Sequence, residues 1–381
     1  MTLIHLMTWL MLSAMLSCPG SIRVTNISTV NKDSDWTQLG GNPEHDGEAF
    51  NEVKPPLTQL WRSSVDHAPN GNLTAAQGKI FVTTMGGKVV ALDHETGISL
   101  GSLNLEKSIG KGIAIDGIHG YFGRVGGDET LFGYELRNGI YVWQKKIGPV
   151  ESMPLVVGEL LYVTTANGEL FCLDAETGTV KWSFKSGKPF HSTPTKSEGL
   201  IYAASDSGYV YALYASSGKL KWKYLTAAPV FSSPIVHGAD LFIANLSGRI
   251  YSLDKITGEI NWEFRGEGSF YSMASIGNDA LFIASGSGIL YKIGLSQGNL
   301  IWMSDLSAPV SEGLLVSGNY IYVGSLNHNL YCLSAETGEI VWQEKLDGRV
   351  RTAPIEHAGK IFIGAEDKYV YAYTNLVQVN E

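Results

Sequence analysis

The sequence is poor in cysteine. Only Cys18, Cys172 and Cys332 occur in 381 residues. Three cysteines are too few for the disulfide framework that staples small secreted domains. The chain also has no CxxC pair and no histidine–cysteine spacing typical of a zinc or haem site. We therefore expect stability to come from a hydrophobic core, and we expect no metal site built on cysteine.

Positive charge is scarce as well. The chain has 28 Lys and Arg against 37 Asp and Glu, a formal net charge of −9, and its basic residues form no block. Binding to nucleic acid relies on clustered cations that neutralise phosphates. The composition therefore argues against a nucleic-acid partner.

Long hydrophobic runs are missing after residue 16. The apolar run at residues 3–16 has signal-peptide length and is too short to span a bilayer, although no Lys or Arg precedes it. Residues 15–18 (Met-Leu-Ser-Cys) resemble a degraded bacterial lipobox, in which Cys18 would carry the lipid. An ordinary signal peptide with an incidental cysteine is the alternative. Both interpretations predict export, and membrane contact is expected only through such a lipid.

Helical periodicity is not sustained anywhere after residue 20, but a repeat is evident. Most of the tryptophans recur at intervals of 39 or 40 residues, and the first interval is 82. The recurring residues are Trp61, Trp143, Trp182, Trp222, Trp262, Trp302 and Trp342. One mark is therefore missing, near Gly101, where the surrounding residues still follow the pattern.

One unit, residues 226–265, shows what the repeat contains. Four short apolar or β-branched segments (SSPIVHG, LFIANL, RIYSLD and EINWEFR) predict four strands. A Ser-Gly hairpin separates the second from the third, and the turn KITG separates the third from the fourth. Glycine suits the positive φ that such turns need. Four-stranded units cannot bury both faces alone, so they must stack as the blades of a propeller.

The repeat also predicts the number of blades. Fourth strands end at eight positions, the first of them within residues 57–65, which follow no other strands. Three strands at 351–374 lack a fourth, and pairing them with 57–65 would close the ring without an exposed edge. We therefore predict an all-β, eight-bladed propeller at 57–374. It would follow a signal at 1–18 and a linker at 19–56 and precede a tail at 375–381, and it is expected to be monomeric.

Cys172 and Cys332 occupy the same position of the third strand in units four blades apart. They would lie on opposite sides of the ring, beyond the separation of about 7 Å that a disulfide tolerates between Cα atoms. We expect both to be small core residues.

The segment LFCLDAETGTVKW at 170–182 resembles the tryptophan-docking motif of the PQQ-like repeat, the quinoprotein family. The segments at 250–262 and 330–342 match it too, and DWTQLGGNPEHDG at 35–47 resembles the segment that often precedes the first blade. The resemblance covers about residues 35–373 and implies that the seven tryptophans pack between adjacent blades. Gly101 and the lengthened hairpin at 123–135 depart from the pattern, so blades 1 and 2 should be the least regular.

The resemblance leaves two classes of function open. One branch of the family contains PQQ-dependent dehydrogenases, and the other contains non-catalytic propellers such as the BamB lipoprotein of outer-membrane assembly. The adjacent cysteine pair of the alcohol dehydrogenases is absent, loops are short, and no catalytic or calcium-binding residue can be carried over. We therefore predict a non-enzymatic scaffold in the cell envelope, in the periplasm or anchored to the outer membrane, without a cofactor. The alternatives are a dehydrogenase with PQQ and calcium, or a propeller that binds a small ligand or glycan.

A protein partner is expected on the face that carries the links between blades. There, chemistry changes from blade to blade while the rest of the repeat is monotonous. The candidate residues are Lys111, Arg124, Asp128, Glu129, Glu151, His191, Phe231, Tyr271, Glu312 and Arg351. Mixed charge with exposed aromatics is typical of an interaction surface, although loops that vary freely are the alternative. Neighbouring blades would allow Arg351 to pair with Glu312 and Lys111 to pair with Glu151.

The tripeptide Glu44-His45-Asp46 has metal-binding residue types. Adjacent side chains diverge in an extended segment, so we expect a solvated turn here rather than a metal site.

Overall fold

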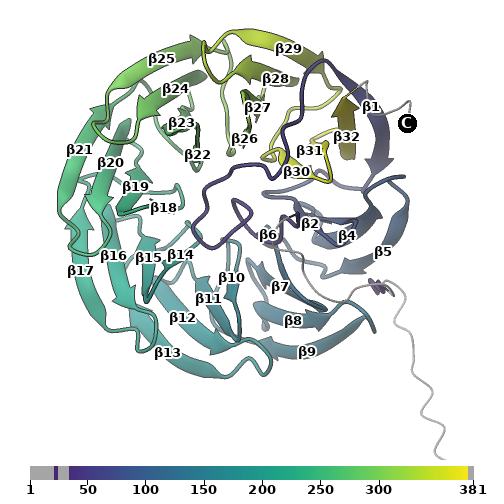
Figure 1. Cartoon of the computed structure of the whole chain (residues 1–381). Coiled ribbons are helices and arrows are strands. Elements are labelled where there is room, and N and C mark those ends of the chain that lie inside the picture. The colour runs from purple at the N-terminus through teal and green to yellow at the C-terminus, as the bar shows by residue number, and fades with distance from the viewer. Residues whose placement is uncertain (1–20, 25–33, 376–381) are drawn as a thin grey trace, which may run out of the picture.

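The computed structural model describes residues 21–24 and 34–375. In this part of the chain, 32 strands form eight four-stranded antiparallel sheets, arranged as blades around a central axis (Figure 1). The predicted eight-bladed propeller is confirmed. Among the described residues, no helix is long and apolar enough to cross a membrane. Cys18, the rest of the predicted signal and residues 376–381 of the tail lie outside the described residues.

The first four blades follow one another along the chain. Blade 1 contains β2 (Thr74–Ala76), β3 (Lys79–Thr83), β4 (Lys88–Asp93) and β5 (Ser99–Asn104). Blade 2 contains β6 (Ile109–Asp116), β7 (His119–Arg124), β8 (Leu131–Glu135) and β9 (Ile140–Lys145). Blade 3 contains β10 (Leu155–Val157), β11 (Leu160–Thr164), β12 (Glu169–Asp174) and β13 (Val180–Lys185). Blade 4 contains β14 (Thr195–Ser197), β15 (Leu200–Ala204), β16 (Tyr209–Tyr214) and β17 (Leu220–Leu225).

The next three blades repeat this order. Blade 5 contains β18 (Ile235–His237), β19 (Asp240–Ala244), β20 (Arg249–Asp254) and β21 (Ile260–Arg265). Blade 6 contains β22 (Ser275–Gly277), β23 (Ala280–Ala284), β24 (Ile289–Gly294) and β25 (Leu300–Asp305). Blade 7 contains β26 (Leu315–Ser317), β27 (Tyr320–Gly324), β28 (Asn329–Ser334) and β29 (Ile340–Lys345).

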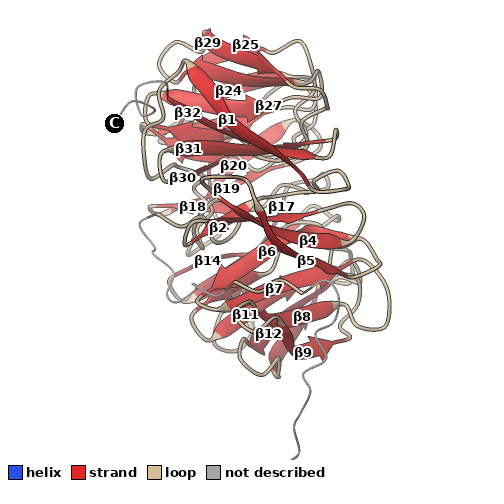
Figure 2. Ribbon diagram, turned by 90° about the vertical axis from the view of Figure 1, so that its right-hand side faces the viewer, coloured by secondary structure: helices blue, strands red, loops and turns tan. Residues whose placement is uncertain are grey.

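Blade 8 closes the ring with strands from both ends of the propeller. It contains β30 (Ile355–His357), β31 (Lys360–Ala365), β32 (Tyr369–Asn375) and, as its outer strand, β1 (Leu57–Ser64). The register runs from Leu57 opposite Asn375 to Ser64 opposite Tyr369. Figure 2 shows β1 lying beside β32 in the side view. The predicted closure is therefore confirmed.

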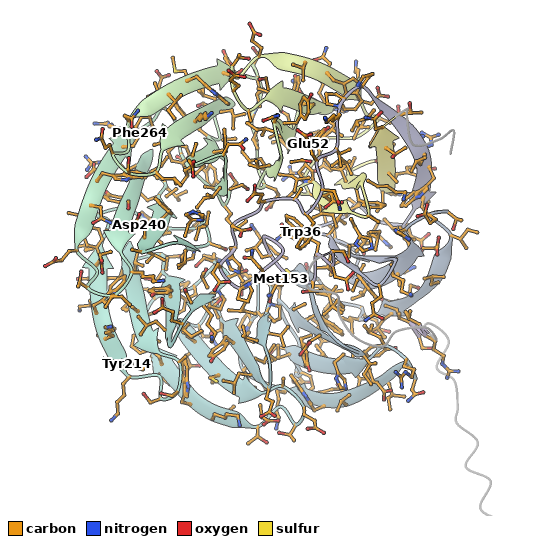
Figure 3. The ribbon with its side chains drawn as sticks, viewed as in Figure 1. Trp36, Glu52, Met153, Tyr214, Asp240 and Phe264 are labelled. Carbon is orange, nitrogen blue, oxygen red and sulfur yellow. The ribbon has the colours of Figure 1, made fainter. Side chains whose placement is uncertain are left out.

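The core lies between blades, because the second and third strands of each blade are buried on both faces. In blade 5, the four central residues of β20 are all buried, whereas the outer strand β21 buries only Trp262 and leaves most of its residues exposed. Figure 3 places Trp36 and Met153 near the axis and Tyr214 on the outer part of the ring. The pattern is that of two-faced inner strands and one-faced outer strands.

Six tryptophans join a blade to the next one in the same way. Each indole N–H donates to a carbonyl in the turn of the following blade, over 2.7–3.3 Å: Trp61 to His94, Trp143 to Ala175, Trp182 to Ala215, Trp222 to Lys255, Trp262 to Leu295 and Trp302 to Ala335. The ring also covers the glycine of that turn. A Cβ added to Gly258 would lie 2.6 Å from the ring of Trp222, and Gly258 has a φ of 76°. Glycine is thus required for two reasons: it tolerates the positive φ, and it leaves room for the docked indole ring.

Trp342, the seventh, meets a different partner. Its ring lies against Tyr373 of blade 8, with centroids 6.0 Å apart and planes at 71°. Blade 8 takes its outer strand from β1 rather than from a turn after β32. The closing blade therefore offers an aromatic edge where the other blades offer a turn.

Blades 1 and 2 are the least regular, as predicted. Residues 21–24 fill the place of the missing tryptophan at Gly101. A Cβ on Gly101 would lie 2.9 Å from the carbonyl oxygen of Ser21, and one on the blade 2 turn glycine, Gly139, would lie 2.9 Å from that of Ile22. Val24 N–H donates to Leu136 O over 2.8 Å, and both Ile22 and Val24 are buried. In addition, β6 has eight residues and a register shift.

Residues 34–56, here called the strap, lie inside the ring, where the sequence predicted a linker. The strap crosses the centre in Figure 1 and passes the innermost strands one after another. Backbone bonds join it to six of them: Ala75 to Trp36, Ile115 to Thr37, Lys196 to Pro43, Val236 to Glu44, Ile276 to Asp46, and Ala49 to Val316. The free edges of these inner strands are thereby covered.

Buried polar groups fasten the strap. The carboxylate of Glu356 on β30, which is 0% exposed, accepts from the backbone N–H groups of Phe50 and Asn51 and from the side-chain amide of Asn51, over 3.0–3.2 Å. His45 is fully buried, with Nδ1 2.9 Å from Thr195 Oγ1. The expectation of a solvated turn at residues 44–46 was therefore wrong, because the strap is packed against the inner strands.

Cys172 and Cys332 are free and buried, as predicted. Burial raises the pKa of the Cys172 thiol to about 11 and that of Cys332 to about 12. Both thiols therefore stay protonated at neutral pH and act as packing atoms.

Candidate functional site

The links between blades surround a cavity at the mouth of the central channel. Its volume is about 520 Å³, within the range of about 300–1,000 Å³ that holds ligands. We call it the cup. Seven of the ten predicted interface residues line it: Lys111, Glu151, His191, Phe231, Tyr271, Glu312 and Arg351. They gather because six of them lie in the links between blades, three or four residues before an innermost strand, and Lys111 is the third residue of β6.

The other three predicted residues lie apart from the cup, on the second hairpin of blade 2. Arg124 places its guanidinium over the ring of Phe132 and donates to Leu105 O over 3.3 Å. Asp128 is fully exposed and pairs with Lys146 at 3.6 Å. With Glu129 they lie outside the cup, because the hairpin connects β7 and β8 rather than leading into an innermost strand.

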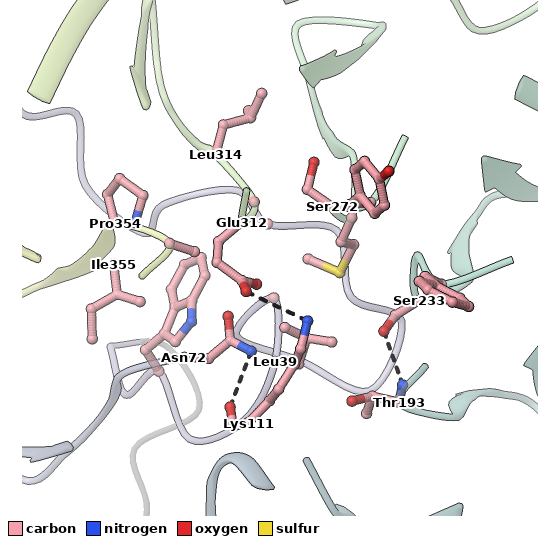
Figure 4. Close-up of a pocket in the computed structure, with 18 of the residues that line it drawn as sticks. Leu39, Asn72, Lys111, Thr193, Ser233, Ser272, Glu312, Leu314, Pro354 and Ile355 are labelled. Atoms are coloured by element: carbon pink, nitrogen blue, oxygen red, sulfur yellow. Dashed lines mark hydrogen bonds and ion pairs between the residues drawn. The ribbon is translucent and has the colours of Figure 1, made fainter. Parts of the chain in front are cut away.

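The floor of the cup is a bridge across the channel. Lys111 Nζ of blade 2 lies 3.4 Å from Glu312 Oε1 of blade 7 (Figure 4). Beneath it, a cavity lined by Trp36 and Leu39 of the strap has a free volume of about 40 Å³, enough for only a few water molecules. The strap thus closes the channel from the side opposite the mouth, and the cup is blind.

One wall of the cup is acidic and centred on a histidine. His191 Nδ1 lies 2.7 Å from Glu151 Oε2, and its Nε2 lies 3.1 Å from Asp206 Oδ2. Burial raises the pKa of Asp206, although His191 opposes the shift. Two carboxylates against one histidine leave this wall with a net negative charge.

The opposite wall is basic. Arg349 and Arg351 of blade 8 both direct their Nε–H groups at the carboxylate of Glu366. Burial opposes ionisation of Glu366, but the bonds to the two arginines hold its pKa below the usual range. Two cations against one anion leave this wall with a net positive charge.

Aromatic side chains separate the two walls on one side. The ring of Phe231 in blade 5 packs edge-on against His191, with centroids 5.0 Å apart. Tyr271 in blade 6 is 45% exposed. Exposed aromatics with a polar surround are frequent anchors of binding sites.

The ion pairs differ from those that the sequence predicted. Lys111 pairs with Glu312 rather than with Glu151, and Arg351 pairs with Glu366 rather than with Glu312. The repeat fixes the blade on which a residue lies. It does not show that a lysine can reach across a narrow channel or that a second hairpin supplies a carboxylate.

Sequence reasoning also missed several residues. Asp206 and Glu366 come from second hairpins, which were noted only as turns. Trp36 of the strap was part of a recognised motif, and that motif was the one available signal for its position. Among the described residues, no group of three or more His, Cys, Asp or Glu is arranged to hold a metal ion.

Known structures share this architecture across different functions. BamB from Moraxella catarrhalis superposes with a TM-score of 0.73 at 18% identity, covering 84% of this chain and 100% of that one. A europium-containing methanol dehydrogenase gives 0.79 at 12% identity, covering 90% and 98%. Quinohemoprotein alcohol dehydrogenase from Comamonas testosteroni gives 0.76 at 14%, covering 91% and 81%. These likenesses show the fold alone.

Sequence comparison is more specific. A curated outer membrane protein assembly factor BamB of Burkholderia pseudomallei (strain K96243) is 26% identical over 140 residues, 35% of this chain and 36% of that protein. The match therefore spans about a third of that relative. A family model described as outer membrane protein assembly factor BamB matches residues 57–155, 127–267, 193–309 and 286–376. These matches span the propeller. The chain therefore belongs to the PQQ-like repeat family that is described as outer membrane protein assembly factor BamB.

Proposed function

We propose that the protein is an exported, non-enzymatic scaffold that binds a protein partner in the cell envelope and serves outer-membrane protein assembly. The observation that supports this most is the cup, where charges of both signs and exposed aromatics gather on one face of an otherwise repetitive ring. Membership of the BamB family agrees with it. Mixed charge with aromatic anchors suits a protein surface.

A charge-reversal variant tests the proposal. Glu151→Lys, Glu312→Lys and Arg351→Glu together invert both walls and the floor of the cup. The variant should fold, because these residues are only partly buried and surface pairs contribute little to stability. Chemical crosslinking in the native envelope should then recover less of the protein partner than it recovers with the parent.

The matched control inverts the opposite face. Glu176→Lys, Glu259→Lys and Glu336→Lys change three exposed turn residues that the structure keeps far from the cup. Capture of the partner should be unchanged. Loss of capture in this variant, with normal capture in the cup variant, would show that the partner binds the turns instead.

The dehydrogenase alternative needs a carboxylate set that holds calcium and the quinone. The carboxylates of the cup are instead engaged by His191, Lys111 and the two arginines of blade 8. Incubation of the pure protein with PQQ and Ca²⁺ should therefore give no dye-linked alcohol oxidation. Turnover under these conditions would overturn the non-enzymatic assignment.

Anchoring through Cys18 is the second part of the proposal. If this residue is the lipid-bearing first residue of the mature protein, it anchors the propeller through acyl chains alone. Cys18→Ser should then move the protein from the membrane to the soluble fraction. A mature N-terminus downstream of Cys18 would instead show an ordinary signal peptide.

A further inference from the structure

The cup is a blind, polarised cavity rather than a channel. The bridge between Lys111 and Glu312 forms its floor, and the strap blocks the space below. Anything that enters must therefore leave by the same opening. A chain end or a projecting loop fits this shape, whereas a flat protein surface does not.

The charges of the cup have a direction. The acidic wall, Glu151 and Asp206 around His191, belongs to blades 3 and 4. On the basic wall, Arg351 lines the cup and shares the carboxylate of Glu366 with Arg349; these residues belong to blade 8, which lies opposite blade 4 in an eight-membered ring. A ligand that spans the cup therefore meets negative charge at one end and positive charge at the other.

Apolar surface lies between these poles. Phe231 and Tyr271 occupy blades 5 and 6, between the acidic and the basic wall, and Val310 and Leu326 of blade 7 continue the lining. Tyr271 is 45% exposed, so about half of its surface is available to a ligand. The order around this side is acidic, aromatic, aliphatic and basic.

We propose that the cup receives one projecting loop of the protein partner, in which an apolar side chain stands between a basic and an acidic residue. The basic residue would face Glu151, the apolar one Phe231 and Tyr271, and the acidic one Arg351. This inference rests on the proposed function, because it takes the partner to be a protein. It adds which part of that partner enters and in which orientation.

The two kinds of contact have different roles. Every charge in the cup already has a partner, so an entering charge exchanges one ion pair for another and mainly sets orientation. The aromatic wall has no such occupant and supplies the gain in buried apolar area. Truncating the aromatics should therefore weaken binding more than changing a single charge.

A defined peptide tests this on the full-length protein. The probe is a blocked, fluorescently labelled heptapeptide with tryptophan at its centre, lysine two positions before it and glutamate two positions after it. We expect saturable binding by anisotropy, weakened at least tenfold by Phe231→Ala with Tyr271→Ala. A peptide with lysine at both flanks should bind at least fivefold more weakly than the probe. Equal binding by the double variant, or by the two peptides, would overturn the inference.

The control variant removes exposed apolar side chains elsewhere. Ile301→Ala with Met303→Ala truncates residues of β25 on the outer rim that are 49% and 59% exposed. This variant should bind the probe like the parent. Weakening by the rim variant alone would place the peptide on β25 instead.

Photocrosslinking in the native envelope links the probe to the real partner. A benzoyl-phenylalanine at position 271 should attach to a partner segment that has an apolar residue with both charge signs nearby. Attachment to a glycan, to a lipid or to a segment without these charges would contradict the inference. If charge reversal abolishes partner capture while the aromatic variant keeps it, the inference about the loop is wrong but the proposed partner-binding face is retained. If neither variant affects capture, the proposed face fails as well.

Discussion

Adjacent blades are joined in two ways: by a docking tryptophan of the repeat at most junctions, and by residues from the N-terminal segment at the junction of blades 1 and 2. Six blade junctions are closed by a tryptophan that belongs to the repeat, with its N–H on the next turn and its ring on the turn glycine. The junction of blades 1 and 2 is closed by residues 21–24, which come from outside the repeat. At these seven junctions a filled groove and a hydrogen bond to the turn recur, and tryptophan is only one way to supply them.

The two solutions differ in how the filling group is attached. A docking tryptophan belongs to the outer strand of its own blade, so it is positioned when that blade folds. Ile22 and Val24 must be held in place by their own burial and by the bond from Val24 to Leu136. The strap is attached in the same indirect way, through Glu356 and through backbone bonds to inner strands. N-terminal contacts should therefore open before repeat-built ones.

Deleting residues 57–64 should have the largest effect, because it removes an N-terminal contact that also completes a blade. Loss of β1 leaves β32 with an unpaired edge and removes Trp61 from the junction with blade 1. We expect aggregation in place of a monomer. Size-exclusion chromatography with light scattering checks this. A deleted chain that stays monomeric and melts like the parent would contradict the closure.

Trp262→Ala should come next, because it empties a repeat-built junction. Trp262 is 8% exposed and its N–H bond to Leu295 O is 2.7 Å. Truncation of a buried tryptophan costs about 3–5 kcal/mol. Urea unfolding should show this loss as an earlier transition. A loss below about 1 kcal/mol would mean that the junction does not depend on its docking residue.

Ile22→Ala with Val24→Ala empties the groove between blades 1 and 2, and its effect should be smaller. We expect the free energy of unfolding to fall by about 2–4 kcal/mol, because the loss cannot exceed the cost of releasing residues 21–24 from the groove. Limited proteolysis should cut near residues 21–24 well before the propeller unfolds. Simultaneous cutting and unfolding would show that this junction is as firmly built as the others.

Acid should weaken the strap moderately. Burial lowers the pKa of His45 to about 3, and burial together with the neighbouring His357 lowers the pKa of His94. The folded pKa of His45 lies below the unfolded value, so the stability that this neutral histidine contributes is complete above about pH 6.5 and declines as pH falls, by about 1.4 kcal/mol per pH unit. The lowered pKa of His94 acts in the same direction. Melting temperatures at pH 7.5 and 5.5 measure this, and His45→Gln should reduce the difference. No change between these pH values would show that His45 is not held neutral.

Much of the fold was predictable because the same order of strands and turns recurs along the chain, so that incomplete units can be recognised as well. The spacing of the tryptophans gave the blade count, and the incomplete first and last units gave the closure by β1. The strap was not predictable, because residues 34–56 have no period and resemble a polar linker. His45 was expected in solvent for the same reason. No local pattern shows that a polar segment is covered by inner strands from seven different blades.

The site was predictable in position but not in detail. Equivalent repeat positions brought Phe231, Tyr271 and Arg351 into one cavity. The pairs were wrong, because a repeat position fixes an angle around the axis but not the distance across it. Lys111 reaches Glu312 because the channel is narrow at that depth. Arg124, Asp128 and Glu129 do not line the cup, since their hairpin connects β7 and β8 instead of leading into an innermost strand.

The strap has a consequence for the order of folding. It bonds to inner strands from blade 1 to blade 8, so it cannot reach its final place until the chain has been made as far as β30. β1 is likewise the first strand of the described chain and pairs with β32, the last one. Contacts between such distant residues form slowly. We expect the middle blades to form early, while residues 34–64 stay unpaired until β30–β32 are available, so that chaperones would bind the folding chain chiefly through these residues.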